Sequence, residues 1–210
     1  MKNLFFLLFL TSKIAISQND DRLGIGIVNL NYPKKPLLFL EDTVKKKVKY
    51  RIPFSAKEKI SETLLNNSWL IPVQSLFFGP EGIPNNFDVI CMEHQRFWLR
   101  VKVDPKSDAS YWVHIDESLS FFEWNKYLNS KFCVRRIDGK NKIRKLNSVT
   151  SDSIDSKRYD CSKVIEVKGY WLKVKPFMNK QGETVTKDDG SFGWIQWRNK
   201  NSLMIYYYNN

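Results

Sequence analysis

Histidine is scarce in this chain, and its scarcity argues against several kinds of active site. There are only two, His94 and His114. Cys91 and His94 have the C-x-x-H spacing of some metal ligands, but residues three apart in a strand point to opposite faces. A structural metal site needs further ligands nearby, and the sequence offers none. The sequence therefore predicts no metal, no cofactor and no catalytic residues, and we expect that the protein is not an enzyme.

Long apolar runs are also missing, apart from one near the amino terminus. Residues 4–10 are apolar and follow a lysine, and Ala15 and Ser17 provide small residues at the −3 and −1 positions of a cleavage site. The run is too short to span a membrane. We therefore expect residues 1–17 to be a signal peptide cleaved before Gln18, with a buried strand as the alternative. The mature protein is expected to be periplasmic or secreted.

Cysteine is nearly as rare, with three residues at positions 91, 133 and 161. None lies near the expected cleavage site, so the sequence does not support a lipid anchor. An oxidising compartment permits a disulfide, and Cys133 with Cys161 is the favoured pair because both fall in the same expected domain. Three buried thiols are the alternative. An odd number leaves at least one cysteine outside any intramolecular pair.

Acidic residues are outnumbered by basic ones, and the formal net charge is +12 at pH 7. Such a charge favours acidic partners, including nucleic acid, anionic lipid and anionic cell-wall polymers. The cations are spread along the chain with a single short run at 45–47. A basic surface that only keeps the protein soluble is therefore an equally good interpretation. The expected signal peptide argues against nucleic acid as the partner.

Aromatic residues, in contrast, are abundant at 14%, and they form a motif that occurs twice. Residues 97–102 read FWLRVK, and residues 170–175 read YWLKVK. A second tryptophan-containing segment follows each copy, at 111–115 and at 193–197. The apolar runs that close the two units are residues 119–124 and 203–208. Repetition of these segments in one order predicts two copies of a small β-domain.

Side chains of a strand alternate between its two faces, and this alternation selects candidate binding residues. In the first copy Phe97, Leu99, Val101 and Val103 share one face, and in the second copy Tyr170, Leu172 and Val174 are expected to face inward. The candidate ligand-binding residues on the other face and on the following strands are Trp98, Arg100, Lys102, Trp112, Trp171, Lys173, Lys175 and Trp194. They predict a shallow groove with an aromatic floor and cationic edges, suited to an acidic peptide, a glycan strand or a partner's loop. The alternative is that each tryptophan covers the next strand and each cation is solvated.

The remaining segments predict one short helix and several connections. Ser55 and Glu58 have the form of a capping box. Apolar residues at helical spacing follow, so we expect a helix at 55–66. Residues 79–86 contain two glycines and two prolines, which predicts a loop. Residues 125–130 are the expected domain boundary.

Both copies of the motif resemble the core of bacterial SH3-like domains, in which a G-x-W-x-K-V segment precedes a G-W-I segment. The resemblance rests on GYWLKVK with GWIQWRNKNSLMIYY in the second copy, and on RFWLRVK with YWVHID in the first. It implies a mainly β fold of two tandem small SH3-like β-barrels, the first with a short helical insertion. It also implies an elaborated N-terminal unit at 22–128 and a C-terminal domain at 131–210. Residues 41–80 depart from the pattern.

The same resemblance implies that the protein binds cell-wall peptides or protein partners outside the cytoplasm, without catalysis. Because β-domains occupy both units, no room remains for a catalytic domain. We therefore expect a non-catalytic extracytoplasmic binding protein whose partner is a cell-wall fragment or an envelope protein. Two alternatives stay open. One is a structural or assembly subunit, and the other is a periplasmic inhibitor of the immunity type that blocks its partner through a loop such as 177–191.

Overall fold

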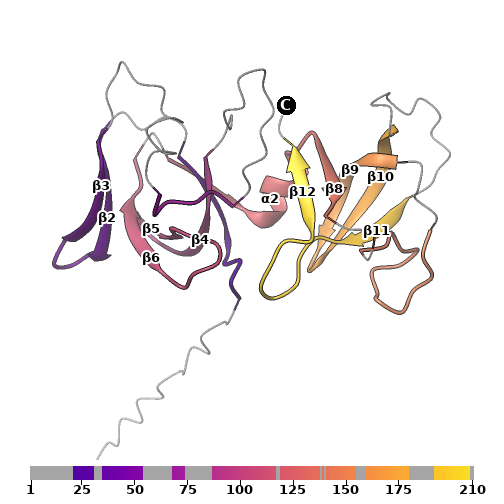
Figure 1. The fold of residues 1–210 in the computed structure, drawn as a ribbon, viewed down its shortest axis with the longest axis horizontal. Helices are drawn as coiled ribbons and strands as arrows, with labels where there is room; N and C mark the ends of the chain where they lie inside the picture. Colours follow the sequence, from indigo (N-terminus) through magenta and orange to yellow (C-terminus); the bar gives the residue numbers. More distant parts are fainter. Residues whose placement is uncertain are drawn as a thin grey trace, which may run out of the picture.

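The computed structural model describes residues 21–30, 35–53, 68–73, 87–116, 119–137, 139, 141–154, 159–179 and 192–208. The expected signal peptide at 1–17, the helix at 55–66 and the loop at 79–86 lie outside these ranges. The described chain is mainly β, as predicted, with two antiparallel sheets and one short helix. Figure 1 shows the sheets side by side along the longest axis, with the helix between them.

The first sheet has seven strands. They are β1 (Gly26–Asn29), β2 (Leu37–Asp42), β3 (Lys47–Ile52), β4 (Asp88–Gln95), β5 (Trp98–Lys102), β6 (Ser110–His114) and β7 (Ser120–Glu123). Their order across the sheet is β3-β2-β6-β5-β4-β1-β7, and each neighbouring pair is antiparallel. Buried and more exposed residues alternate along β5 from Trp98 to Val101, as expected for a strand with one face on the core, and Lys102 departs from this pattern because it is also buried.

The second sheet has five strands, and the helix α2 (Trp124–Asn129) connects it to the first. Its strands are β8 (Cys133–Arg136), β9 (Tyr159–Lys168), β10 (Trp171–Asn179), β11 (Gly193–Gln196) and β12 (Ile205–Tyr208). They lie in the order β11-β10-β9-β8-β12, again with antiparallel neighbours. All strands of the first sheet thus precede α2 in the chain, and all strands of the second follow it.

Neither sheet closes into a barrel within the described residues, so the expectation of closed barrels is wrong. Closure needs hydrogen bonds between the two outermost strands of a sheet. In the first sheet these strands are β3 and β7, which lie at opposite edges. The chain passes from β7 directly into α2 and on to the second sheet, instead of crossing over to β3.

The two sheets share one strand order. Strands β8, β9, β10, β11 and β12 of the second sheet occupy the places of β1, β4, β5, β6 and β7 in the first. Isolated bridges take the places of β2 and β3, since Arg144 pairs with Trp194 of β11 and also with Ser153. The repetition visible in the sequence motif therefore extends to the topology of both sheets.

The turns that precede the two motif copies also agree. Two residues, Arg96 and Phe97, connect β4 to β5, and two residues, Gly169 and Tyr170, connect β9 to β10. The first residue of each turn has a positive φ, 33° at Arg96 and 54° at Gly169. Glycine adopts this conformation without the steric cost that a side chain brings. The second copy thus has the residue that the turn favours, and the first copy makes the same turn with arginine.

Two apolar clusters form the core of the molecule. One lies within the first sheet, around the fully buried Phe39, Leu99 and Val113. The other spans both sheets, and we call it the shared cluster. Its members include Ile27 and Ile90 of the first sheet, Trp124, Tyr127 and Leu128 of α2, and Leu172, Val174 and Ile195 of the second sheet. The two halves of the chain therefore bury apolar surface together, while their division into domains at 22–128 and 131–210 stays a prediction.

Helix α2 occupies the stretch for which the sequence analysis expected only a domain boundary. Its buried residues Trp124, Tyr127 and Leu128 are spaced so that they lie on one helical face. Trp124 Nε1 donates a hydrogen bond of 2.8 Å to the carbonyl oxygen of Leu23, and its ring lies 5.1 Å from that of Trp197. The described part of the chain contains no helix that is long and apolar enough to cross a lipid bilayer.

A disulfide joins Cys133 of β8 to Cys161 of β9. Their Cα atoms are 5.8 Å apart, within the usual range for a bridged pair. This is the pair that the sequence analysis favoured. Cys91 of β4 is a free, buried cysteine. Burial raises the pKa of the Cys91 thiol to about 12, which keeps the sulfur protonated at neutral pH.

Candidate functional site

Charged and aromatic side chains form a row across three strands of the first sheet. Arg100 of β5 lies opposite Glu93 of β4 on one side and opposite Trp112 of β6 on the other. Arg100 Nη1 is 3.8 Å from Glu93 Oε2, and Arg100 Nε donates a 2.9 Å hydrogen bond to Ser110 Oγ. We call Glu93, Arg100 and Trp112 the first row. Its cation therefore stands between a carboxylate and an indole on neighbouring strands.

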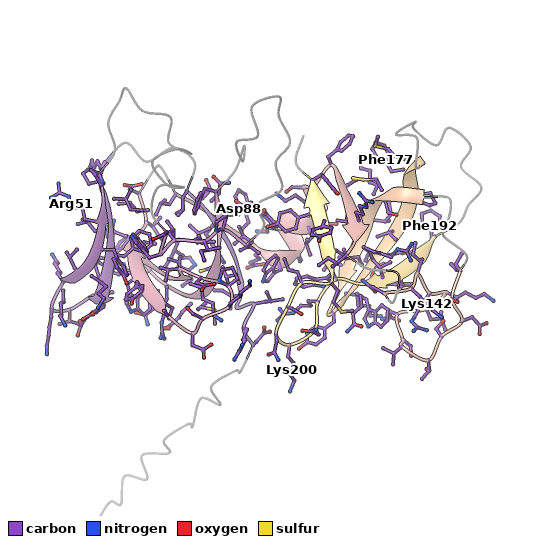
Figure 2. The ribbon with its side chains drawn as sticks, in the orientation of Figure 1. Arg51, Asp88, Lys142, Phe177, Phe192 and Lys200 are labelled. Carbon is purple, nitrogen blue, oxygen red and sulfur yellow. A yellow bond between two sulfur atoms is a disulfide. The ribbon has the colours of Figure 1, made fainter. Side chains whose placement is uncertain are left out.

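The second sheet carries an equivalent row. Lys173 of β10 lies opposite Glu166 of β9 and opposite Trp194 of β11. We call these three residues the second row. Lys173 Nζ is also 5.4 Å from the ring centroid of Phe192, whose place on the second sheet is labelled in Figure 2. At this distance an ammonium group is attracted to the face of the ring.

The register around the two rows is the same. In the first hairpin a register shift separates the Glu93–Arg100 pair from the Cys91–Val101 pair. In the second hairpin the equivalent shift separates the Glu166–Lys173 pair from the Val164–Val174 pair. A bulge of this kind bends a strand and redirects its side chains. Both copies therefore present their rows from strands with the same local irregularity.

Two further candidate residues, Trp98 and Trp171, lie next to the rows on β5 and β10. Trp98 is opposite His114, and the centroids of their rings are 4.9 Å apart at an interplanar angle of 87°. Trp171 is opposite Gln196 on one side and Lys168 on the other. In each sheet a second tryptophan thus lies next to the row, two residues before the cation on the same strand.

Burial follows the predicted alternation within β5 from Trp98 to Val101, but Phe97 and Tyr170, which were expected to face inward, are 50% and 40% exposed because they lie in the turns before β5 and β10. Leu99 and Val101 are fully buried, whereas Arg100 between them is exposed. The four candidate tryptophans, Trp98, Trp112, Trp171 and Trp194, are half-buried. Each ring therefore packs on its own sheet and still offers part of its surface to a ligand. Four of the candidate residues lie on the first sheet and four on the second, so they form two separate groups.

Lys102 differs from its expected position at an exposed cationic edge. Its side chain is 3% exposed, and its Nζ lies 3.8 Å from Asp108 Oδ1 without a hydrogen-bond partner among the described residues. Burial lowers the pKa of Lys102. The pairing of Cys91 with Val101 places Lys102 beside Ile90, whose side chain belongs to the shared cluster. The equivalent Lys175 in the second sheet is half-buried.

The two copies agree in chemical type on the outward face as well as in the core. Buried equivalents are Leu99 with Leu172, Val101 with Val174 and Val113 with Ile195. Outward equivalents are Glu93 with Glu166, Trp98 with Trp171, Arg100 with Lys173 and Trp112 with Trp194. Core packing accounts for the first set. The second set needs an explanation that includes the surface of the protein.

A buried polar cluster lies outside these rows, and the sequence analysis missed it. Asp88 of β4 accepts hydrogen bonds from the Tyr127 hydroxyl and, at 2.8 Å, from Asn29 Nδ2. Lys131 Nζ lies 3.4 Å from the centroid of the Tyr127 ring. Burial raises the pKa of Asp88 and lowers that of Lys131 to about 8. These residues come from segments that are far apart in the sequence, so no local motif predicts that they lie together. Figure 2 labels Asp88 on the side of the first sheet near α2.

Cys91 and His94 do not form a reactive pair. The Cys91 thiol is buried and donates to the carbonyl oxygen of Glu93 at 3.4 Å, while His94 is exposed and its ring lies 5.2 Å from that of Phe121. In the part of the chain that the structure describes, no three His, Cys, Asp or Glu side chains are grouped as metal ligands. The rows carry indole rings and charged groups, through which they can contact a ligand.

No protein-family model matches the chain, and no curated protein sequence matches it.

Proposed function

We propose that this chain is a non-catalytic binding protein that acts outside the cytoplasm. Its partner is a cell-wall fragment or an envelope protein, and the contact is made by the first and second rows with Trp98 and Trp171. The observation that carries this proposal is the agreement of outward-facing residues between two copies of one topology. Packing explains why the buried Leu99 and Leu172 agree, but it does not explain why Arg100 and Lys173 agree.

The chemistry of the rows favours an acidic ligand with an apolar or sugar body. Tryptophan and arginine contribute much of the binding energy at many protein interfaces, because they combine large contact area with directed polar groups. A half-buried indole beside a cation can cover the body of a ligand while the cation meets its anionic group. The excess of basic over acidic residues, which remains after loss of residues 1–17, attracts such ligands from a distance.

The resemblance to bacterial SH3-like domains supports the same proposal, since these small folds are used as binding modules. The expected signal peptide at 1–17 is the basis for placing the protein in the periplasm or outside the cell. When the full chain is expressed in a bacterial host, N-terminal sequencing of the exported protein is expected to begin at or near Gln18. Recovery of a cytoplasmic protein that keeps residues 1–17 would contradict export and reopen nucleic acid as a partner.

The central test is co-sedimentation of the purified protein with peptidoglycan sacculi. Trp171→Ala is expected to weaken binding by about tenfold or more, the loss typical of a central aromatic contact. The control is Phe122→Ala, which removes an exposed aromatic ring from the edge strand β7. The melting temperature of each variant is measured on the same preparation. Lys173→Ala is expected to act mainly through the salt dependence of binding.

Two results would contradict the proposal in different ways. If Trp171→Ala lowers the melting temperature but the folded variant binds with unchanged affinity, the tryptophan serves packing alone. If the unmodified protein does not bind sacculi, capture from envelope extracts is the next experiment. A partner retained there through the rows would favour the assembly or inhibitor function, whereas a partner retained equally by Trp171→Ala and Trp98→Ala would contradict a role of the rows.

A further inference from the structure

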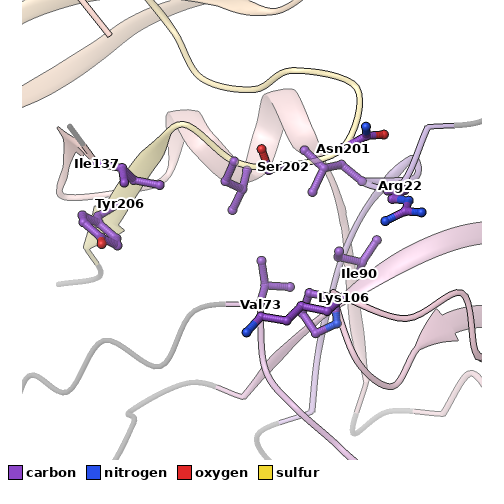
Figure 3. A pocket seen from close by; sticks show the side chains of 11 residues that line it. Arg22, Val73, Ile90, Lys106, Ile137, Asn201, Ser202 and Tyr206 are labelled. Atoms are coloured by element: carbon purple, nitrogen blue, oxygen red, sulfur yellow. The ribbon is translucent and has the colours of Figure 1, made fainter. Parts of the chain in front are cut away.

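A pocket of about 370 Å³ lies between the two sheets, but its polar groups do not converge on one point. Figure 3 labels Arg22 and Tyr206, two of the lining residues, at opposite ends of it. The carboxylate of Asp108 lies 3.9 Å from Arg22 Nε, and Asp104 accepts a hydrogen bond of 2.8 Å from the backbone N–H of Lys106. The positive charge at this pocket is therefore partly neutralised by the protein itself.

A more pronounced cationic surface is the hairpin formed by β2 and β3, which we call the basic hairpin (residues 37–52). Figure 1 shows it at the end of the molecule farthest from the second sheet. It contains the lysine run at 45–47, which the proposed function does not use. Between positions 41 and 51 two acidic residues face five basic ones, Lys45, Lys46, Lys47, Lys49 and Arg51.

One of the two acidic residues, Glu41, pairs with cations of β3. Its Oε2 atom lies 2.5 Å from Lys47 Nζ, and its Oε1 atom lies 3.4 Å from Lys49 Nζ. A single carboxylate thus serves two ammonium groups. The strand β3 therefore keeps an excess of positive charge after these ion pairs have formed.

The other acidic residue, Asp42, fixes the conformation of the hairpin tip. Its Oδ1 atom accepts hydrogen bonds from the backbone N–H groups of Val44 at 2.7 Å and of Lys45 at 3.0 Å. A turn of this kind is held in one conformation by the side chain of its first residue, and Lys46 follows with a positive φ of 51°. The side chains of Val44, Lys45 and Lys46 are all exposed at this tip.

The exposed valine distinguishes this tip from a surface that is only charged. Val44 is 88% exposed, more than any other large apolar side chain among the described residues. Val48 and Leu38 of the same hairpin are exposed as well. A soluble polyanion would contact the ammonium groups and leave Val44 in water. The interface of an anionic bilayer would remove Val44 from water while the ammonium groups meet lipid phosphates, so the combination favours a bilayer.

We propose that the basic hairpin binds the surface of a lipid bilayer that contains anionic phospholipids. Val44 enters the headgroup region, and the ammonium groups of Lys45 and Lys46 contact phosphate groups beside it. Each basic residue near such a surface raises the affinity about fivefold, the equivalent of about 1 kcal/mol. The hairpin lies on the bilayer and does not span it. This surface is separate from the two rows and goes beyond the function proposed for them.

The test is co-sedimentation of the purified, exported protein with lipid vesicles. Phosphatidylcholine vesicles that contain about 30% phosphatidylglycerol are expected to bind the protein about tenfold or more tightly than pure phosphatidylcholine vesicles do. Raising the NaCl concentration from about 0.05 M to about 0.5 M is expected to release most of the protein, because salt screens the attraction. The double variant Lys45→Gln with Lys46→Asn is expected to bind about tenfold more weakly. Asparagine tolerates the left-handed backbone conformation at position 46.

A matched double variant removes the same charge far from the tip. Lys142→Gln with Lys200→Gln neutralises two exposed lysines of the second half of the chain and is expected to change the affinity by less than about twofold. Trp171→Ala alters the candidate site of the proposed function and is expected to bind vesicles normally, so failures of the two proposals can be told apart. Equal weakening by the two double variants would overturn the proposal, because binding would then follow net charge alone. Equal binding to both kinds of vesicle would also overturn it.

Insertion of the tip separates a bilayer from a soluble polyanion. The variant Val44→Cys is labelled with a dye whose emission shifts to the blue in an apolar environment, and anionic vesicles are expected to cause this shift. The matched site is Val149→Cys, an exposed valine of the second half, where the emission is expected to stay unchanged. The free Cys91 does not compete for the dye, because its thiol is buried and protonated. Unchanged emission at position 44, or an equal shift at both positions, would overturn the proposal.

Discussion

Lys173 on β10 lies directly opposite Trp194 on β11, and Arg100 has the same relationship to Trp112 in the first sheet. The segments that connect these strand pairs differ in length, yet the register is the same. A slip of one residue would turn the buried leucine and valine side chains of either motif toward solvent. Burial of these apolar residues therefore fixes which cation meets which tryptophan, whatever the length of the connection.

Replacement of Lys102 by methionine is expected to leave the free energy of unfolding unchanged or to raise it by about 1 kcal/mol, because a buried ammonium group is costly to desolvate. Its Nζ makes no hydrogen bond within the described ranges. The matched variant is Lys175→Met at the equivalent position of β10, where the side chain is half-buried. Lys175→Met is expected to change the free energy of unfolding by less than about 0.5 kcal/mol. Urea unfolding measures both. A decrease in the free energy of unfolding well above 1 kcal/mol in Lys102→Met alone would show that the ion pair with Asp108 outweighs the cost of desolvating the ammonium group.

Loss of the disulfide between Cys133 and Cys161 is expected to destabilise the protein. The bridge closes a loop with a sequence separation of 28. The chain-entropy estimate for a loop of this length is about 3 to 4 kcal/mol. Urea unfolding with and without dithiothreitol gives the value for the unmodified protein. The double variant Cys133→Ser with Cys161→Ser should unfold at the same urea concentration in both buffers, and a remaining effect of dithiothreitol would mean that another bridge exists.

The buried Lys131 makes a prediction about pH. Its pKa is lowered from 10.5 to about 8 in the folded protein, chiefly by burial. Between these values the unfolded chain binds more protons at this site than the folded chain does, so the contribution of Lys131 to stability rises with pH. Between pH 8 and 10.5 this contribution to the free energy of unfolding increases by at most about 3 kcal/mol. It is measured as the difference between the unmodified protein and Lys131→Met in urea unfolding at pH 7.5 to 10.5. A difference that does not change over this range would contradict the lowered pKa.

The shared cluster predicts how fragments of the chain behave. Residues 131–210 hold the second sheet and are expected to unfold cooperatively, but this fragment lacks Trp124, Tyr127 and Leu128 of α2. A fragment of residues 124–210 restores these three side chains and should therefore melt at a higher temperature. Removal of large buried side chains typically costs about 2 to 5 kcal/mol each, so the difference should be easy to detect by calorimetry. Equal melting temperatures would mean that α2 contributes nothing to the second sheet.

Much of the local structure could be predicted from the sequence, because it depends on alternation within single strands. The pattern of Leu99, Arg100 and Val101 is enough to assign β5 and its two faces. Helix α2 was missed although Trp124, Tyr127 and Leu128 have helical spacing. The preceding run of apolar residues extends the strand pattern into the helix, and a helix of six residues offers few repeats of its period.

The contacts between the halves of the chain could not be predicted in this way. Lys102 has the same place in its motif as Lys175, yet it is buried, and its Nζ lies 3.8 Å from Asp108. The pocket beside it brings together Arg22, Lys106 and Ser202, which are far apart in the chain. No periodicity within one strand contains information about such neighbours. The resemblance to small barrels had the same weakness, since it described each copy as a closed unit.

The shared cluster also has a consequence for how the two rows could meet one ligand. Because Ile27, Ile90 and Leu128 are buried in the same cluster as Leu172, the two sheets are held by packing and not by a flexible linker. The distance between the first and second rows is therefore a fixed property of the molecule. If the rows bind an acidic polymer as proposed and face the same side of the molecule, a polymer whose acidic groups repeat at that distance would contact both rows in one binding event, and the second contact would require little further loss of translational freedom. A shorter fragment of the same polymer would reach only one row, so affinity should increase abruptly at a threshold of ligand length.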